Sequence, residues 1–311
     1  MPQNVAVLTL TTSGTEEPSP ERVRRFQRRV LDWGPRNLRQ LPWRATRDPW
    51  SVLVSEVMLQ QTQVDRVIGY YETFLDTFPT PHACARAAVG DVVRLWSGLG
   101  YNRRALNLHR AATAIVAQHG GKVPADEKAL RALPGVGSYT ARAILSFAFE
   151  ADVAAVDTNV VRVLARAVVG TGLPLREAQR VADRLLPAGR SWDFNQAMFD
   201  LGATLCTAVN PSCRQCPLRQ QCRWRRSGLT SPDPWRASPS ARPQARFAGS
   251  DRQGRGRLVH ALRQGAVSRE MLASACGWPD DRARADRITA SLVAEGFAEW
   301  GAGHPELLQL R

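Results

Sequence analysis

Leu133-Pro-Gly-Val-Gly-Ser-Tyr-Thr-Ala141 carries the clearest fold signal in this chain. Helical periodicity from about Asp126 stops at the proline, two glycines permit a tight turn, and Ser138 is placed to cap a second helix that continues through Phe147. Glycine suits a turn whose amides approach a phosphate, and the dipole of the following helix adds to the attraction. A simple compact connection between two helices is the alternative. The stretch predicts a helix, a hairpin and a helix, with a phosphate-binding turn at Gly135, Val136 and Gly137.

A second segment, Ala155-Val-Asp157-Thr-Asn-Val160, follows a short distance further along the chain. An Asp at this point is most simply the N-cap of a helix that continues through Leu164. Because Asp157 lies a short distance after the hairpin, we expect its carboxylate to face whatever the hairpin binds. Asp157 is therefore a candidate for stabilising a developing positive charge.

A third segment, Trp50 to Val64, places Glu56 among apolar residues at helical spacing, with no Lys or Arg inside the segment. A carboxyl in such surroundings tends to stay protonated, which is what a general acid needs at neutral pH. The alternative is an exposed Glu on the polar side of the helix.

Four cysteines follow an apolar segment at spacings typical of metal ligands, and they are Cys206, Cys213, Cys216 and Cys222. Four thiolates suit either an iron-sulfur cluster or a structural zinc ion, and spacing alone leaves both open. Disulfides are less favoured, because residues 1–19 lack the basic and apolar regions of a secretory signal. We therefore expect a cytoplasmic protein, with Cys84 and Cys276 buried as small apolar residues.

Composition favours an intracellular protein with a polyanionic partner. The 311 residues are 44% hydrophobic and suggest two folded units, and no apolar run approaches the length of about 20 needed to span a bilayer. A formal charge of +14 favours nucleic acid, since basic side chains release counterions when they neutralise phosphates. Ordinary solvated surface is the alternative for part of that charge.

The chain is expected to be mainly α-helical. Residues 1–20 are predicted to be disordered, residues 21–222 form a helical domain, and residues 223–257 form a basic linker. Trp224, Trp235 and Phe247 lie among the basic residues of the linker, where they either stack on bases or anchor it to its own domain. Residues 258–311 read as three helices and a strand hairpin, which predicts a small winged-helix-like domain.

Further motifs occur in a fixed order with those above. They are Leu-Pro-Trp-Arg at 41–44, Ser-Glu-Val-Met-Leu-Gln-Gln-Thr-Gln-Val at 55–64, Gly-Leu-Gly-Tyr at 98–101, the hairpin, Val-Asp-x-Asn-Val at 156–160 and the four cysteines. Over residues 21–222 this order resembles the adenine DNA glycosylases of the helix-hairpin-helix superfamily.

The resemblance implies two helical modules flanking a cleft, one of them completed by a [4Fe-4S] cluster on the cysteine loop 206–222. It implies removal of adenine mispaired with 8-oxoguanine or guanine in double-stranded DNA, by a monomer in the bacterial cytoplasm that associates with the nucleoid and not with a membrane. Glu56 would protonate the adenine ring, Asp157 would stabilise the oxocarbenium-like sugar, and Tyr139 would lie beside it. DNA contacts would come from Arg44, Leu59, Gln61, Tyr101, Gly135, Val136 and Gly137.

The hairpin also indicates the reaction type. Lyase-type relatives carry a nucleophilic lysine where this chain has Tyr139, and the only lysines here, Lys122 and Lys128, precede the hairpin. We therefore predict a monofunctional glycosylase that leaves an abasic site without cutting the strand.

The chain departs from the family pattern at two positions and in its tail. Relatives often have Gly at Thr158 and a second aromatic at Asn102, and many carry a C-terminal domain resembling a nucleotide hydrolase where this chain has about 60 residues. Three alternatives stay open: a T:G or U:G mismatch glycosylase, a non-catalytic iron-sulfur lesion sensor that binds DNA, and a zinc-stapled helical regulator.

Overall fold

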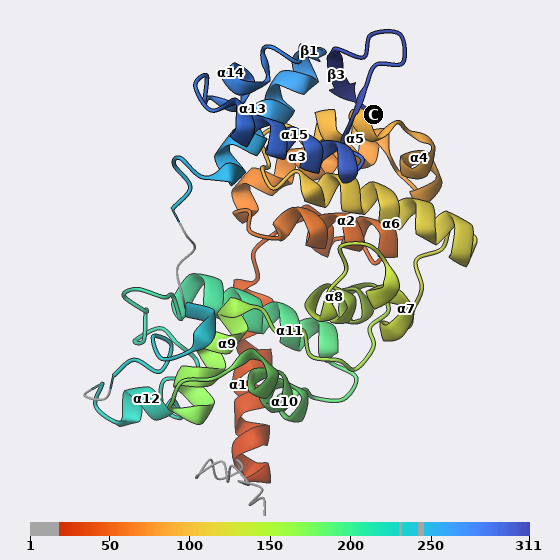
Figure 1. The fold of residues 1–311 in the computed structure, drawn as a ribbon. Coiled ribbons are helices and arrows are strands. Elements are labelled where there is room, and N and C mark those ends of the chain that lie inside the picture. Colours follow the sequence, from red (N-terminus) through yellow and green to blue (C-terminus); the bar gives the residue numbers. More distant parts are fainter. Residues whose placement is uncertain (1–18, 230–231, 242–245) are drawn as a thin grey trace, which may run out of the picture. The chain divides into compact units, whose positions relative to one another are not determined.

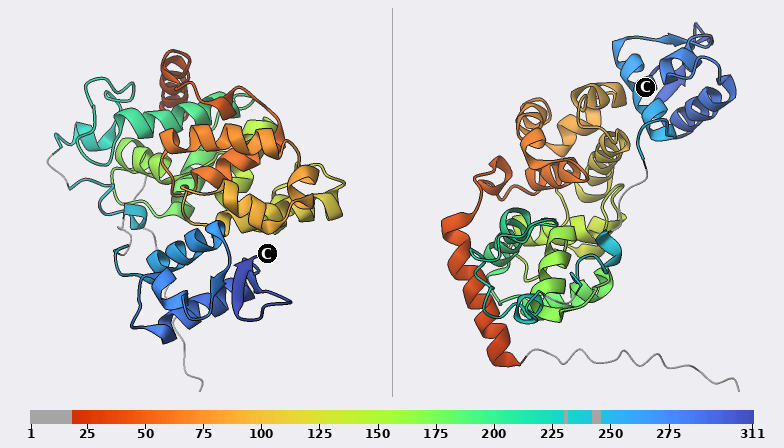
Figure 2. Two further views of the ribbon diagram at one scale, coloured as in Figure 1. Left: turned by 90° about the horizontal axis from the view of Figure 1, so that it is seen from above. Right: turned by 90° about the vertical axis from the view of Figure 1, so that its left-hand side faces the viewer.

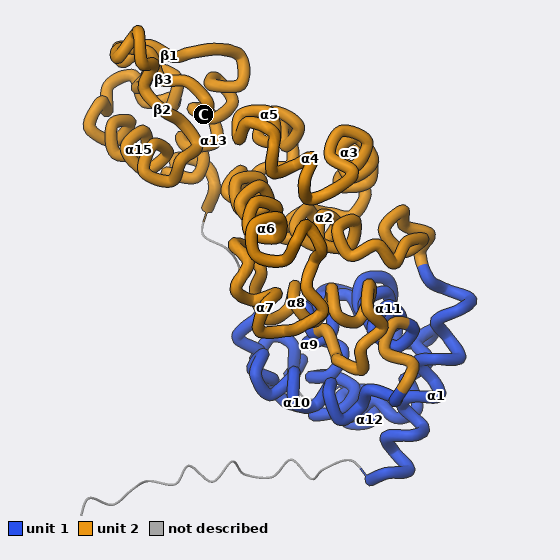
Figure 3. The backbone as a smooth tube through the Cα atoms, turned by 90° about the vertical axis from the view of Figure 1, so that its right-hand side faces the viewer, with its two compact units in different colours: residues 1–38, 156–188, 193–242 blue, residues 39–155, 189–192, 243–311 orange. Residues whose placement is uncertain are grey.

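The computed structural model describes residues 19–229, 232–241 and 246–311, and these residues form a mainly helical fold (Figure 1). The predicted fold class is confirmed in this respect. Most of the segment predicted to be disordered, residues 1–18, lies outside the described residues. The chain forms two compact units, drawn in different colours in Figure 3: residues 1–38, 156–188 and 193–242, and residues 39–155, 189–192 and 243–311.

The first unit is built on the long amphipathic helix α1 (Pro20–Asn37). Ser19 caps α1 by accepting from the Arg22 amide at 3.4 Å, and Pro20 stands at the first helical position, which tolerates proline. The buried face of α1 includes Phe26, whose ring lies 6.3 Å from that of Phe194. The other helices are α9 (Thr158–Leu164), α10 (Leu175–Leu185), most of α11 (Ser191–Asp200) and α12 (Arg223–Arg226), with π-helical turns at Ala165–Val169 and Leu201–Leu205 and a 3₁₀ turn at Pro239–Ala241.

The second unit has the apolar helix α2 (Pro49–Leu59) at its centre. Asp48 caps α2 and Pro49 begins it, and all but three of its residues are buried, because it packs against α3, α6 and α8. Around it lie α3 (Val64–Thr77), α4 (Pro81–Arg86), α5 (Val89–Leu95), α6 (Arg103–His119), α7 (Glu127–Ala132) and α8 (Ser138–Ala148), with a 3₁₀ turn at Pro42–Arg44.

The C-terminal segment of the second unit combines three helices with a small sheet (Figure 2). Its elements are α13 (Asp251–Gln264), β1 (Val267–Ser268), α14 (Leu272–Cys276), α15 (Arg282–Ala294), β2 (Ala298–Trp300) and β3 (Leu307–Leu310). The strands form an antiparallel sheet in the order β1-β3-β2, in which Leu308 pairs with both Val267 and Trp300. Helix α13 begins at Asp251, inside the segment predicted to be a linker. The winged-helix comparison and the domain boundaries stay predictions.

Within the described residues, no helix has the length and apolar character needed to cross a lipid bilayer.

Candidate active site

The helix-hairpin-helix predicted from the sequence is present. Helix α7 starts at its N-cap Asp126, whose carboxylate accepts from the Ala129 amide at 2.8 Å, and it ends just before Leu133. Gly135 has φ +80°, a left-handed conformation in which a side chain is strained. A Cβ added there would also lie 2.8 Å from Cβ of Asn107. Glycine is therefore required at this turn, and the predicted helix limits are confirmed to within one residue.

The predicted cap of the second helix was wrong by one position. Ser138 is the first residue of α8, and the cap is Gly137, whose extended backbone (φ −86°, ψ 177°) starts the helix without a side-chain capping bond. The Val136 amide donates to the Leu133 carbonyl at 3.1 Å, so this hydrogen bond closes the turn and the amide is not available to a phosphate. Gly137 has no side chain to cap the first turn of α8, and the N-terminus of a helix is an arrangement that can bind a phosphate oxygen.

Glu56 is buried in α2, with 4% of its surface exposed, and the predicted burial is confirmed. Gln60, at the C-terminal end of the same helix, donates to the Thr140 hydroxyl at 3.4 Å and to the Gly135 carbonyl at 3.5 Å. Residues four apart lie on one face of a helix, so Glu56 lies one turn from Gln60 on the side where Gln60 contacts the hairpin. That Glu56 and the hairpin form one site stays a prediction, which the Gln60 contacts support.

Leu59, Gln61 and Tyr101 are the candidate DNA wedge, the side chains predicted to insert into the opened duplex, and two of them have left-handed backbones. Gln61, after α2, has φ +57°, and Tyr101, before α6, has φ +45°, and both side chains are exposed. Such conformations are uncommon outside glycine and persist only where neighbouring structure imposes them.

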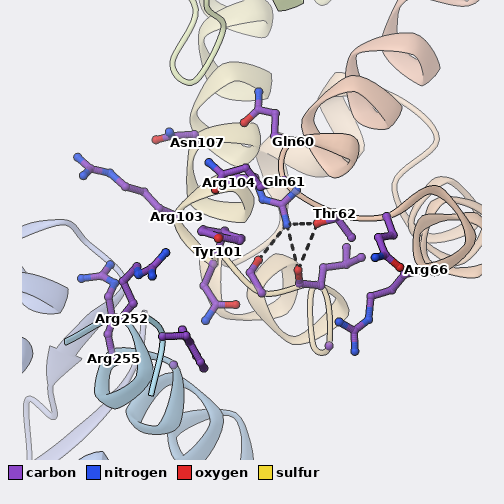
Figure 4. A pocket seen from close by; sticks show the side chains of 17 residues that line it. Gln60, Gln61, Thr62, Arg66, Tyr101, Arg103, Arg104, Asn107, Arg252 and Arg255 are labelled. Atoms are coloured by element: carbon purple, nitrogen blue, oxygen red, sulfur yellow. Dashed lines mark hydrogen bonds between the residues drawn. The ribbon is translucent and has the colours of Figure 1, made fainter. Parts of the chain in front are cut away.

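Arg104 joins the two segments that carry these residues, and the sequence did not reveal its role. Its buried guanidinium donates to the Met58 carbonyl at 2.6 Å and to the Val57 carbonyl at 3.0 Å, at the end of α2. It also donates to the carbonyls of Leu99 and Gly100, each at 3.1 Å, and to the Thr62 hydroxyl at 2.9 Å, as Figure 4 shows. Burial lowers the pKa of Arg104 to about 10, so the side chain still carries its charge at neutral pH. The buried guanidinium of Arg104 thus joins the two wedge segments, which are residues 60–63 after α2 and residues 98–104 at the start of α6.

The other predicted site residues of this unit belong to helices α2 and α8 and to the 3₁₀ turn Pro42–Arg44. Tyr139 is the second residue of α8 and Leu59 the last residue of α2, and both are half-buried. Arg44 lies in the 3₁₀ turn, where its Nη1 donates to the Arg39 carbonyl at 2.9 Å. Arg44 therefore stabilises this turn, and its predicted contact with DNA stays a prediction.

Asp157 lies in the first unit and is the N-cap of α9, as predicted. Its Oδ1 accepts from the Val160 amide and its Oδ2 from the Asn159 side chain, both at 2.7 Å. Burial raises the pKa of the Asp157 carboxyl, while these two donors and the Arg162 guanidinium act in the opposite direction by favouring the ionised form. The carboxylate is thus fixed in orientation. A cleft shared by Asp157 and Glu56 stays a prediction, because the two residues belong to different units.

A chain of hydrogen bonds connects Asp157 to the cysteine loop. Asn159, which donates to Asp157, accepts from Arg162 Nη2 at 2.7 Å, and Arg162 Nε donates to the Cys206 carbonyl at 2.6 Å. Gly202 lies so close to Asn159 that an added Cβ would be 2.8 Å from the Asn159 Cβ. Sequence reasoning missed Arg162, whose only sequence signal is its position one turn after Asn159 in a helix.

All four predicted metal ligands line one small cavity of about 20 Å³ in the first unit. Arg166 Nη1 lies 3.5 Å from the Cys206 sulfur, and the Cys222 thiol donates to the Arg166 carbonyl at 3.4 Å. None of the six cysteines forms a disulfide. Among the described residues, no three His, Cys, Asp or Glu side chains are grouped closely enough to hold a single metal ion.

Burial raises the pKa of the Cys206, Cys216 and Cys222 thiols, that of Cys216 to about 12. Thiols of this kind are protonated at neutral pH, so a metal centre bound there must displace their protons. Cys84 and Cys276 are fully buried elsewhere, as predicted.

The aromatic residues of the predicted linker divide into two kinds. Trp224 and Trp235 pack over the guanidinium groups of Arg166 and Arg162, 4.9 and 5.2 Å from the ring centroids, and so anchor this segment to the first unit. Phe247 belongs to the second unit and is 56% exposed.

Comparison with known proteins agrees with this geometry. Residues 54–184 match the HhH-GPD superfamily of base excision DNA repair proteins. The adenine DNA glycosylase of Mycolicibacterium smegmatis is 41% identical over 87% of this chain and 91% of its own length, and that of Mycobacterium tuberculosis is 44% identical over 86% and 88%. A solved thermostable thymine-DNA glycosylase superposes with a TM-score of 0.62 at 28% identity, over 66% of this chain and 97% of its own. The chain therefore belongs to the helix-hairpin-helix superfamily of base excision DNA repair proteins and, within it, to the adenine DNA glycosylase family.

Proposed function

We propose that this protein is a monofunctional DNA glycosylase that hydrolyses the bond between adenine and its deoxyribose where adenine is mispaired with 8-oxoguanine or guanine. The observation that carries this function is the buried Glu56, one helical turn before a residue that contacts the hairpin. Membership of the adenine DNA glycosylase family supports the choice of base. The enzyme acts as a monomer on double-stranded DNA, at the nucleoid of a bacterial cytoplasm.

The proposed reaction uses two carboxyl groups in opposite states. Adenine is a poor leaving group unless a ring nitrogen is protonated, and a buried, neutral Glu56 supplies that proton. The electron pair of the glycosidic bond then leaves with the base, and the sugar develops oxocarbenium character. Asp157, ionised and oriented by Val160 and Asn159, stabilises this cation until water adds to C1′ and loses its proton. The products are free adenine and an abasic site.

The target nucleotide has to leave the base stack before Glu56 reaches it. Unstacking costs a few kcal/mol, which side chains inserted into the duplex offset. Gln61 and Tyr101, exposed and joined through Arg104, are suited to insertion because their loops are already ordered, and Leu59 lies beside them. The hairpin and the N-terminus of α8 bind the backbone phosphate.

The four cysteines fit a [4Fe-4S] cluster better than a zinc ion. They line one cavity, yet they are not grouped for a single ion, and a cubane cluster places its thiolate ligands further apart than one ion does. Bound there, the cluster would supply a covalent cross-link between the ends of the loop 206–222. Arg166 stabilises the thiolate of Cys206, and Arg162 orients the same residue through its carbonyl.

The protein as purified should be yellow-brown, with broad visible absorption. Cys213→Ser should lose most of this absorption and yield less soluble protein, whereas Cys276→Ala, which removes a buried thiol far from the loop, should keep the colour. Visible spectra and iron and sulfide analysis measure the difference. A colourless protein with one zinc ion per chain would instead support a zinc-stapled regulator.

Base release from a panel of duplexes tests the proposed function. Duplexes with A:8-oxoguanine and A:G should release adenine, and the labelled strand should break only after hot alkali, because the position of the lyase lysine holds Tyr139. Release of thymine or uracil from T:G or U:G duplexes, without adenine, would favour the mismatch glycosylase. Binding without release from any duplex would favour the non-catalytic sensor.

A further inference from the structure

The second unit contains a cavity of about 870 Å³ whose wall comes from two distant parts of the chain. One part consists of the wedge segments, residues 60–63 and 98–104. The other part belongs to the C-terminal segment and consists of Phe247, Arg252, Arg255 and Gly256. Arg252 and Arg255 extend from α13 toward the side of the cavity that carries Tyr101 (Figure 4).

The wall of this cavity is cationic. Five arginines line it, and none of the described residues that line it is an Asp or a Glu. The guanidinium of Arg104 is hydrogen-bonded to carbonyls of the wedge segments. Arg255 forms a bidentate pair with Glu295 at 2.9 and 3.0 Å, and Arg103 lies 3.6 Å from the same carboxylate. One carboxylate shared by two arginines leaves an excess of positive charge in this part of the wall, and Arg66 and Arg252 are the remaining arginines that line it. Such a wall favours an anionic ligand with more than one charge.

Exposed aromatic rings accompany this charge. Phe247 is 56% exposed and Tyr101 is 41% exposed, and both line the cavity. The Arg252 guanidinium lies 5.8 Å from the centroid of the Phe247 ring. Aromatic rings beside arginines are typical of surfaces on which bases stack while the backbone phosphates are neutralised.

The C-terminal segment is fixed to the wedge by specific hydrogen bonds. Arg263 of α13 donates from Nη2 to Oδ1 of Asn102 at 2.8 Å and from Nε to the Val93 carbonyl at 2.9 Å. Asn102 directly follows the wedge residue Tyr101, and it stands where relatives often have a second aromatic. At the far end of the segment, the Gly90 amide donates to the Arg311 carbonyl at 2.6 Å. The side chain of Asn102 is thus hydrogen-bonded to Arg263 of the C-terminal segment.

We propose that the C-terminal segment is part of the DNA-binding surface. Arg252 and Arg255 bind phosphates of the double-stranded DNA at the point where Gln61 and Tyr101 enter it, and Phe247 stacks on a base exposed there. Arg263 positions both α13 and the wedge through Asn102. This surface belongs to α13 and not to α15, the helix that a winged-helix comparison would place in the major groove. The inference rests on the proposed function, because it takes DNA as the ligand.

Binding to a fully paired duplex, followed by fluorescence anisotropy over a range of salt concentrations, tests this surface without any base release. Arg252→Ala should weaken binding to every duplex by a similar factor and should lower the slope of log K against log salt by about 1. Arg252→Lys should keep the slope. Phe247→Ala should weaken binding to a duplex that contains one unpaired base by about tenfold, since base stacking contributes about 1–3 kcal/mol. Arg287→Ala, an exposed arginine on α15 outside the cavity, is the matched control and should bind like the unsubstituted protein.

Thermal unfolding of each variant separates loss of binding from loss of fold. Unchanged affinity and slope in folded Arg252→Ala and Phe247→Ala would overturn the proposal, and so would a reduced slope in Arg287→Ala alone, because that result places the DNA on α15. Neither result alters adenine release by the unsubstituted protein. Conversely, if no mispair released adenine, the proposed function would be wrong. The salt dependence of DNA binding would still show whether α13 contacts DNA.

Discussion

Glu56→Gln is expected to bind an A:8-oxoguanine duplex as tightly as the unsubstituted protein and to release adenine about 10²–10⁴-fold more slowly. Gln has nearly the shape of Glu, so the buried helix α2 and its packing on α8 should be preserved. The amide has no proton to give to the departing base, so adenine would have to leave as an anion. Single-turnover adenine release and anisotropy on the same duplex separate the chemical step from binding.

Glu72→Gln is the matched control, because Glu72 is an exposed carboxyl on the neighbouring helix α3. It should release adenine at the unsubstituted rate. If Glu56→Gln released adenine at more than about a tenth of that rate, the loss would fall below what removal of a general acid produces, and Glu56 would not be the acid.

Asp157→Asn should slow adenine release by about 10²–10³-fold, because a neutral amide cannot stabilise a cationic sugar and a preorganised charge of this kind contributes about 3 kcal/mol. Asn is as good an N-cap as Asp, so the new side-chain oxygen should still accept from the Val160 amide and α9 should start at the same residue. The new amide nitrogen cannot accept from Asn159 as Oδ2 of Asp157 does, so thermal unfolding is needed to measure the cost of that lost bond. Single-turnover release, together with thermal unfolding, measures the two effects separately.

Asp281→Asn makes the same change at another helix cap, since Asp281 caps α15 by accepting from the Arg284 amide at 3.0 Å. It should leave adenine release unchanged. Near-full activity in Asp157→Asn, or an equal loss in Asp281→Asn, would reject the role assigned to Asp157.

Local chemistry made part of this site predictable from the sequence. Pro134 and Gly135 mark a turn through backbone constraints that act within a few residues, and the apolar residues at helical spacing around Glu56 predict an apolar helix face. Asp157 is identified as a cap by the same local logic. Ser138 was misplaced by one residue, because a glycine with an extended backbone also starts a helix and leaves no side-chain signature.

Contacts to backbone carbonyls explain most of what the sequence did not reveal. Arg104 donates to Val57, 47 residues away, and Arg162 to Cys206, 44 residues away. A carbonyl carries no information about residue type, so neither bond leaves a motif. Arg263 and Asn102 are 161 residues apart in the sequence, and only the fold brings the two side chains into contact.

The pH dependence of single-turnover adenine release tests most directly whether one carboxyl is neutral while the other is charged. Asp157 must be ionised, and because burial raises its pKa, the rate should fall with acidification at a higher pH than an exposed Asp would give. Glu56 must carry its proton, so the rate should also fall as the solution becomes alkaline. We predict a bell-shaped profile of rate against pH. A rate that stays level at every pH at which the protein remains folded would contradict the account.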